Sequence, residues 1–222
     1  RALFATIADR YDFITRVLSY GQDRRWKRIL IARARVRAGE RALDLASGTG
    51  DLAVGASALG ANAIGLDITH RMMELARHRV ASLPHRIPFL TGDMTALPFA
   101  TASFDLVTTG YGLRNVPDLD TSIDEIARVL KPGGRLLSLD FNKPDNPIVR
   151  ATYLGYLTVV GSVLGWILHG DPDTYRYIPE SIRRYPGARG VADRLASRGF
   201  TEVEVVPLLF GLMSLHLARR AQ

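Results

Sequence analysis

Short apolar runs alternate with segments of helical periodicity between residues 42 and 141, and this rhythm constrains the fold more than any other feature of the chain. The runs are as short as strands usually are, and they span residues 42–46, 63–67, 87–90, 104–108 and 135–141. Between them, residues 72–80 and 123–130 carry apolar side chains at helical spacing. Strands and helices that alternate in this way form a mostly parallel sheet with helices on both faces. We therefore predict an α/β fold.

The flanking segments predict further elements of the same fold. Residues 7–20 and 23–36 have helical spacing and are separated by Gly21. Residues 203–217 predict two strands around Gly211, which we expect to pair antiparallel at an edge of the sheet.

Residues 151–168 form an uncharged run of eighteen residues. Such a run is at the lower limit for a membrane-spanning helix. Four of its residues are Gly or Ser. We therefore favour a buried helix pair that covers an apolar ligand over a membrane span.

A glycine-rich turn follows the first predicted strand, in the sequence Leu-Asp-Leu-Ala-Ser-Gly-Thr-Gly-Asp of residues 43–51. Such a turn lets the backbone approach a ligand closely, with amide groups exposed at the start of the next helix. Asp67 ends the second strand, where a carboxylate can accept hydrogen bonds from ribose hydroxyls. A tight strand-to-helix turn without a ligand is the alternative.

The charge around this turn distinguishes between nucleotide cofactors. Gly48 to Ala53 satisfies the glycine pattern of dinucleotide-binding proteins. However, Asp44 and Asp51 place negative charge beside the turn, which suits a cationic ligand better than a pyrophosphate. A chain of 222 residues also leaves little room for a separate substrate domain. S-adenosylmethionine, a nucleoside with a sulfonium group, fits both observations, whereas a nicotinamide cofactor does not.

Later motifs extend this pattern in order along the chain. Gly92-Asp93-Met94 follows the third strand, Leu97-Pro98-Phe99 precedes Phe104-Asp105, and Leu130-Lys131-Pro132-Gly133-Gly134 precedes the fifth strand. Together they resemble the class I S-adenosylmethionine-dependent methyltransferases over residues 40–140, which implies a Rossmann-like sheet. The resemblance places cofactor contacts at Asp44, Ser47, Gly48, Thr49, Gly50, Asp67, Ile68, Asp93, Met94 and Gly110.

The flanks carry a narrower resemblance. Tyr11-Asp12-Phe13, Leu18-Ser19-Tyr20-Gly21 and Arg25-Trp26-Lys27-Arg28 look like the entry helices of the UbiE/COQ5 quinone C-methyltransferases. Residues 111–116 (Tyr-Gly-Leu-Arg-Asn-Val), residues 171–182 (Asp-Pro-Asp-Thr-Tyr-Arg-Tyr-Ile-Pro-Glu-Ser-Ile) and Leu215-His216 are also similar to that family. The resemblance implies methylation of a ring carbon in a demethylated menaquinone or ubiquinone precursor, with release of S-adenosylhomocysteine and without a metal.

The resemblance also implies site residues. Arg114 and Asn115 correspond to the pair that the family places near the phenolic hydroxyl, and we expect Arg114 to stabilise the phenolate rather than to act as a base. A structural Arg that caps the loop is the alternative. Asp93 either binds adenosine or orients Arg114 or a water. The acceptor is expected near Tyr11, Tyr111, Tyr175, Tyr177, Ser181 and His216.

Packing is the alternative role for each tyrosine among these residues except Tyr111, and for Ser181. His216 is either a titrating group or a structural residue on an edge strand. Two positions depart from the family: Gly110 stands where a Ser is frequent, and Asp93-Met94 replaces Asn-Ala or Asp-Ala. Ala46, in place of the first glycine of the loop, is common in the family.

From these boundaries we expect a single methyltransferase domain. Its parts are the N-terminal helices (1–40), the cofactor-binding core (41–141), a helical substrate cover (142–186) and a last helix with edge strands (187–222).

The net positive charge of the chain arises from one segment. Residues 1–41 contain 11 Lys and Arg against 4 Asp and Glu, and residues 42–222 contain 18 of each. The net +7 therefore lies in the N-terminal helices. Either they form a solvated basic face, or they meet anionic lipid headgroups beside a bilayer that holds the prenylated substrate. The basic residues proposed for that contact are Arg24, Arg25, Lys27, Arg28, Arg33, Arg35 and Arg37.

The expected partners are a polyprenyl quinol, an anionic membrane surface touched peripherally, and a second copy in a homodimer. Nucleic acid is not expected, because aromatic residues do not interleave with the basic run. No signal-peptide pattern is visible, and we expect a cytoplasmic protein at the inner face of the membrane. Two other functions stay open: a small-phenol or natural-product C-methyltransferase, and a non-catalytic nucleotide-binding scaffold of a quinone-synthesis complex.

Overall fold

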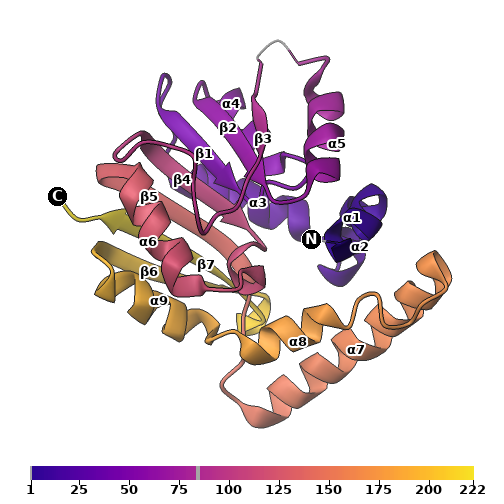
Figure 1. The fold of residues 1–222 in the computed structure, drawn as a ribbon. Helices are drawn as coiled ribbons and strands as arrows, with labels where there is room; N and C mark the ends of the chain where they lie inside the picture. Colours follow the sequence, from indigo (N-terminus) through magenta and orange to yellow (C-terminus); the bar gives the residue numbers. More distant parts are fainter. Residues whose placement is uncertain (1, 84–85) are drawn as a thin grey trace.

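The computed structural model describes residues 2–83 and 86–222, and its seven strands form one sheet (Figure 1). The strands are β1 (Arg41–Leu45), β2 (Asn62–Asp67), β3 (Phe89–Thr91), β4 (Phe104–Gly110), β5 (Leu130–Phe141), β6 (Phe200–Leu208) and β7 (Met213–Arg220). Their order across the sheet is β3-β2-β1-β4-β5-β7-β6. The first five strands are parallel, and β7 is antiparallel to both β5 and β6. The predicted α/β fold is thus confirmed.

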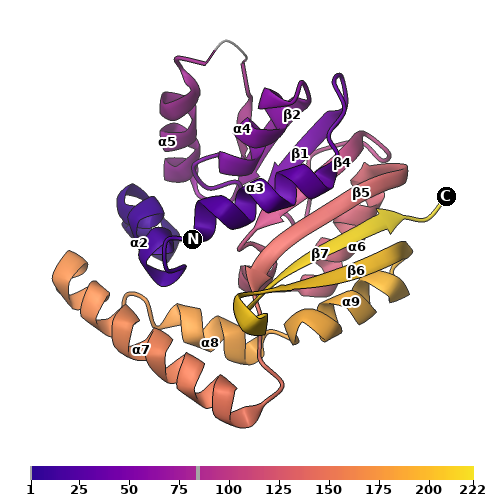
Figure 2. The same cartoon turned by 180° about the vertical axis from the view of Figure 1, so that it is seen from behind.

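Helices cover both faces of this sheet. They are α1 (Ala2–Ile7), α2 (Tyr11–Leu18), α3 (Asp23–Ala34), α4 (Asp51–Ala58), α5 (His70–Val80), α6 (Leu119–Val129), α7 (Pro147–His169), α8 (Tyr177–Arg184) and α9 (Gly187–Ser197). Three 3-10 turns, η1 (Ala8–Arg10), η2 (Leu113–Asn115) and η3 (Leu209–Gly211), complete the described elements. Trp26 of α3, Leu52 of α4 and Met73 of α5 belong to one apolar core, whereas Ile126 of α6 and Val191 of α9 belong to a second. The sheet therefore separates two cores. Figures 1 and 2 show the helices on its two faces.

The uncharged run forms one long helix rather than the predicted buried pair. Asn146 caps α7 by accepting hydrogen bonds from the backbone N–H groups of Ile148 (2.9 Å) and Val149 (3.2 Å), and Gly170 ends the helix at a positive φ of 69°. Figure 2 shows α7 along one edge of the molecule, beside α8 and the N-terminal helices. Only 28% of its most apolar eighteen-residue window is buried, and the rest of this window is half-buried or exposed. In the described residues, α7 is also the one helix long and apolar enough to cross a membrane, which by itself is weak evidence for a span.

The C-terminal strands correct one detail of the prediction. The two strands around Gly211 are antiparallel as expected, but only β6 lies at the edge of the sheet. Strand β7 pairs along its length with β5, from Arg219 opposite Arg135 to Met213 opposite Phe141. Met213 to His216 of β7 are therefore buried, and this determines the role of His216.

Candidate active site

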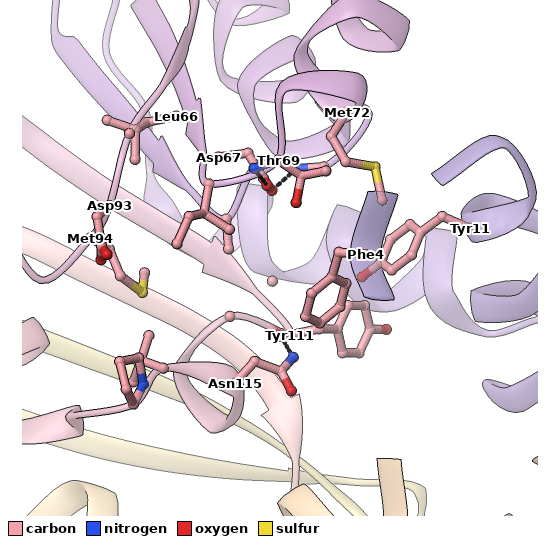
Figure 3. Close-up of a pocket in the computed structure, with 18 residues that line it drawn as sticks. Phe4, Tyr11, Leu66, Asp67, Thr69, Met72, Asp93, Met94, Tyr111 and Asn115 are labelled. Carbon is pink, nitrogen blue, oxygen red and sulfur yellow. Dashed lines mark hydrogen bonds between the residues drawn. The ribbon is translucent and has the colours of Figure 1, made fainter. Parts of the chain in front are cut away.

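A cavity opens at the carboxyl ends of the parallel strands, beside β1, where the strand order reverses. Open α/β sheets bind their ligands at such a switch point. The cavity holds about 690 Å³ of unfilled space, part of it open to solvent. Residues from the loops after β1, β2, β3 and β4 line it, together with Phe4 of α1 and Tyr11 of α2, as Figure 3 shows.

The glycine-rich turn and Asp67 form one hydrogen-bonded unit at the floor of this cavity. Gly48 has a φ of 54°, a left-handed conformation that favours glycine. Its backbone N–H donates to Oδ2 of Asp67 (3.0 Å), and the N–H of Thr69 donates to Oδ1 (2.8 Å) (Figure 3). Burial raises the pKa of Asp67, whereas these hydrogen bonds lower it. The carboxylate therefore reaches the cavity already oriented, with lone pairs left for ligand hydroxyls.

A second, smaller cavity adjoins the first, and the two share Tyr11, Ala46, Gly48, Gly110 and Tyr111. Its other walls include the carboxylates of Asp44 and Asp51, the hydroxyl of Thr49 and the ammonium of Lys27.

One charged network borders the second cavity. Lys27 Nζ lies 2.9 Å from Asp23 and 2.8 Å from Asp51, and Arg79 lies 2.6 Å from the other oxygen of Asp51. The Tyr111 hydroxyl donates to Asp23 (2.7 Å). Although burial alone would raise the pKa of Asp51, Lys27 and Arg79 lower it. The negative charge that the sequence places at Asp51 is therefore compensated by two cations.

Asp44 is the other acidic residue that the sequence predicts beside the turn, and it can accept a cationic group. It is 2% exposed and accepts hydrogen bonds from Ser47 Oγ (2.8 Å), Thr108 Oγ1 (2.9 Å) and the backbone N–H of Ala53 (3.2 Å). Burial raises the pKa of Asp44 to about 7, in spite of these hydrogen bonds. A cationic group beside it would favour the ionised form.

These donors and acceptors fit S-adenosylmethionine. Asp67 suits the ribose diol, and the apolar side chains of Ile68 and Met94 suit the faces of a purine. In the second cavity, Asp44 suits the ammonium and Lys27 the carboxylate of an amino acid. The two cavities therefore match the two ends of this molecule.

Asn115 lies at the far end of the first cavity and also lines a wider outer groove beside α8. Its Nδ2 donates to the backbone carbonyl of Tyr111 (2.8 Å), while its Oδ1 accepts from Nη1 of Arg114 (2.7 Å). Arg114 lines the outer groove but not the first cavity, and its guanidinium packs 4.8 Å from the ring centre of Phe141. Asn115 is thus the member of the pair that faces the cofactor site.

Several sequence-predicted residues do line these cavities. Ile68, Asp93, Met94 and Gly110 line the first, Asp44, Ser47 and Thr49 the second, and Tyr177 and Ser181 the outer groove.

The structure places three predicted residues elsewhere. Gly50 lines neither cofactor cavity: its φ is 89°, and a Cβ there would lie 2.7 Å from the Phe89 ring, so it shapes the turn. Tyr175 is fully buried beside α7, with its hydroxyl 2.9 Å from His169. His216 is fully buried between Ser138 Oγ (3.2 Å from Nδ1) and the Ala188 carbonyl (2.9 Å from Nε2). Its role is structural, and burial lowers its pKa.

Two further predictions concern charge. Lys27 is one of the residues predicted for the basic outer surface, but its side chain is only 15% exposed and is paired with two carboxylates. The carboxylate that pairs with Arg114 is Asp140, at 3.0 Å, rather than the predicted Asp93, whose Oδ1 accepts from Thr95.

Sequence reasoning missed Lys27, Asp23 and Asp140 as site residues. The i, i+4 spacing of Asp23 and Lys27 is equally typical of a surface ion pair on a helix, so spacing could not identify them. Asp140 ends a predicted strand at the ligand-binding edge of the sheet, which was the available signal.

Comparison with known proteins finds a family that matches nearly the whole chain. The profile of the ubiE/COQ5 methyltransferase family matches residues 1–220. The chain is 38% identical to the demethylmenaquinone methyltransferase of Thermus thermophilus over 98% of its own length and all of that protein. It is also 38% identical to the ubiquinone/menaquinone biosynthesis C-methyltransferase UbiE of Dinoroseobacter shibae, over 97% of this chain and 88% of that protein.

Among solved structures, a SAM-dependent methyltransferase from Thermotoga maritima superposes with a TM-score of 0.71 at 19% identity, over 99% of this chain and 98% of that one. This likeness concerns the fold. The family match covers nearly the whole chain, and the chain therefore belongs to the ubiE/COQ5 methyltransferase family.

Proposed function

We propose that the protein transfers a methyl group from S-adenosylmethionine to a ring carbon of a polyprenylated quinol in menaquinone or ubiquinone biosynthesis. One observation carries this proposal: the cavity that fits the cofactor ends at Asn115, beside the groove that contains Arg114. A donor site and an acceptor site with a polar group for a phenolic oxygen therefore adjoin each other. The names of the full-length relatives support the same substrate class.

We propose that residues of the two cavities hold the cofactor by their charges. S-adenosylmethionine supplies an electrophilic methyl group on its sulfonium. Asp67 would accept from the ribose hydroxyls, and Asp93 and Met94 would flank the adenine. Asp44 and Lys27 would pair with the ammonium and carboxylate of the methionine end. The reaction is an in-line displacement, so this positioning supplies much of the acceleration.

The acceptor carbon must also gain electron density, which requires that the quinol lose a phenolic proton. Negative charge on the phenolic oxygen is stabilised by hydrogen-bond donors fixed in advance. The Asn115 carboxamide faces the cavity, and Arg114 behind it stays protonated because Asp140 and the neighbouring tyrosines together outweigh the effect of burial on its pKa. Tyr111 presents its ring, since Asp23 already accepts from its hydroxyl.

We further propose that residues 1–222 act as one domain. Phe4 and Tyr11 of the N-terminal helices, Asp67 of the core and Tyr177 of the cover all line the cavities of this site. Removing any of the three parts would open the site to water.

The test compares a prenylated demethylquinol with a tail-less phenol, both with S-adenosylmethionine under reducing conditions. We expect fast turnover of the prenylated quinol only. Equal rates would favour a small-phenol methyltransferase, and cofactor binding without turnover of either would favour a scaffold. Arg114→Ala should keep cofactor affinity in calorimetry and lose most turnover. An equal loss of both would contradict the role of Arg114.

We also propose that the exposed face of α7 rests on the bilayer that holds the prenylated substrate. Val159, Val163 and Trp166 follow one another at helical spacing and are 64, 51 and 67% exposed. The one Lys, Arg, Asp or Glu side chain of α7 is Arg150, near its start. Contiguous apolar surface of this kind is uncommon on soluble monomers, and interfacial helices bury such a face among lipid headgroups.

The basic N-terminal residues would make a weaker, electrostatic contribution to membrane binding. Lys27 is paired internally, and Arg33 lies 2.7 Å from Glu204 on the surface. The remaining exposed members of the predicted set are Arg24, Arg25, Arg28, Arg35 and Arg37.

Vesicle sedimentation separates these two contributions. We expect Val163→Glu to weaken binding to neutral phosphatidylcholine and anionic phosphatidylglycerol vesicles alike, and Arg24→Glu to weaken binding to anionic vesicles only. Unchanged binding of Val163→Glu would show that α7 is not the contact. Loss of a dimer in light scattering, with vesicle binding retained, would show that a second copy covers this face.

A further inference from the structure

An ion pair lies buried behind the wall of the acceptor site. The side chains of Arg114 in η2 and Asp140 in β5 are 4% and 1% exposed, and Nε lies 3.0 Å from Oδ1. Asp140 also accepts from the backbone N–H groups of Arg114 (3.1 Å, to Oδ2) and Phe141 (2.8 Å, to Oδ1). A well-packed apolar pair is often as stable as a buried ion pair. The stability of the fold therefore does not explain why an ion pair, rather than an apolar pair, is buried at this position.

Neighbouring side chains hold the Arg114 guanidinium in a single orientation. Nη1 donates to Oδ1 of Asn115 (2.7 Å) and to Oγ of Ser181 (3.1 Å), and the ring of Phe141 packs on its face. Ser181 in turn donates to the carbonyl of Ile178 (2.8 Å), so its hydroxyl proton points away from Arg114. The cation therefore directs its strongest hydrogen bond at the Asn115 carboxamide.

Arg114 lines the outer groove but not the first cavity, so its influence on the first cavity passes through Asn115. A cation bound to the carboxamide oxygen draws electrons from the nitrogen and strengthens its N–H donors. One Nδ2 hydrogen is used by the Tyr111 carbonyl, at 2.8 Å. A carboxamide has two such hydrogens, so the other can donate to a phenolate oxygen.

Asp140 keeps this arrangement in place. Without its carboxylate the guanidinium would be an unpaired buried charge, which is strongly destabilising. It would then turn toward the outer groove and its solvent, and the contact with Asn115 would weaken.

We propose that Asp140 is a positioning residue for methyl transfer, which holds Arg114 so that Arg114 polarises the Asn115 carboxamide toward the acceptor. This role rests on the proposed function. It assigns Asp140 no contact with substrate or cofactor.

A double-mutant cycle tests the proposal on the full chain, with kcat measured on a prenylated demethylquinol at saturating S-adenosylmethionine. We expect kcat to fall about 10- to 100-fold in Asp140→Asn, since one preorganised donor is worth at least that much. Cofactor Kd should change less than about threefold. Because Asp140 acts through Asn115, the double variant with Asn115→Ala should be no slower than Asn115→Ala alone. Multiplicative losses, or an equal loss of cofactor affinity, would overturn the proposal.

Two further variants serve as controls for this test. Asp105→Asn removes a carboxylate that pairs with Lys131 (2.7 Å) at the start of β4, and it should keep wild-type kcat. Arg114→Lys keeps the charge but cannot reach both Asp140 and Asn115 as the fork of an arginine does. It should be as slow as Asn115→Ala. If Asp140→Asn fails to fold, full activity of Arg114→Lys overturns the proposal.

Nitrogen-15 NMR separates this proposal from the function on which it rests. The Asn115 side-chain amide signal should shift in the same direction in Asp140→Asn and Arg114→Lys, and stay unchanged in Asp105→Asn. These shifts are expected whether or not the wild-type protein methylates a quinol. An unshifted signal overturns the positioning role, whereas an inactive wild type overturns the proposed function.

Discussion

Lys27 joins helix α3 to the cofactor site, and its removal should destabilise the protein far more than removal of an exposed arginine on the same helix. Lys27 and Asp23 are 15% and 10% exposed, with Nζ 2.9 Å from Asp23 and 2.8 Å from Asp51. Breaking a fully buried ion pair costs about 3–5 kcal/mol. The network is partly hydrated, and Asp23 keeps the hydrogen bond from Tyr111. We therefore expect Lys27→Met to lower the free energy of unfolding by about 2–3 kcal/mol.

Arg33 is the matched control. It lies on α3 as well, and its partner Glu204 is 2.7 Å away, but the two side chains are 42% and 54% exposed. Exposed pairs contribute about 0–1 kcal/mol. Arg33→Met should therefore lower the melting temperature by only about 0–4 °C, against roughly 4–12 °C for Lys27→Met.

Thermal and urea unfolding measure both variants. A cycle of Lys27→Met with Asp23→Asn should give a coupling of at least about 1 kcal/mol, since the second change removes the carboxylate that the first leaves unpaired. Lys27→Met should also weaken cofactor binding in calorimetry, which Arg33→Met should not. Equal destabilisation by Lys27→Met and Arg33→Met, within about 0.5 kcal/mol, would show that the Lys27 ion pairs contribute no more to stability than an exposed pair does.

Three further predictions concern ionisable groups. Asp67→Asn should weaken S-adenosylmethionine binding by about 10- to 100-fold in calorimetry, because charge-assisted hydrogen bonds to the ribose are lost; Asp105→Asn should not, and equal effects would contradict the assignment. Asp44 has a pKa of about 7 without a ligand, so a cofactor ammonium beside it should lower that pKa and release protons on binding at pH 6.5. Calorimetry in buffers of different ionisation enthalpy measures this release, and Asp44→Asn should abolish it. Burial holds the folded pKa of His216 below its ordinary 6.5, so its contribution to stability is complete above pH 6.5 and is lost as pH falls below it. The difference in urea stability between the wild type and His216→Gln should therefore shrink from pH 7.5 to pH 5.5, and a constant difference would contradict it.

Local patterns predicted the strands and the cofactor turn well. Strand β1 is buried at four of its five positions, and three of these four residues are apolar, while Gly48 adopts the positive φ that a glycine in the turn indicates. Asp67 is the last residue of β2, where the sequence places it. Each of these features depends on neighbouring residues in the chain.

Features that depend on distant residues could not be predicted in this way. His216 was expected on an edge strand because the order of β5, β7 and β6 is not visible in local periodicity. The pairing of Asp140 with Arg114 joins residues 26 positions apart across the end of the sheet. The exposure of α7 was missed because an uncharged helix has the same sequence whether protein or lipid covers it.

Methyl transfer to a ring carbon is the central claim, and isotope-labelled mass spectrometry tests it most directly. The protein would be given S-adenosylmethionine with a trideuterated methyl group and a reduced, prenylated demethylquinol. We expect a product that carries one CD3 group, in a fragment that contains the ring carbon, with one S-adenosylhomocysteine formed per product. A CD3 group on oxygen, or S-adenosylhomocysteine formed without a methylated quinol, would contradict it.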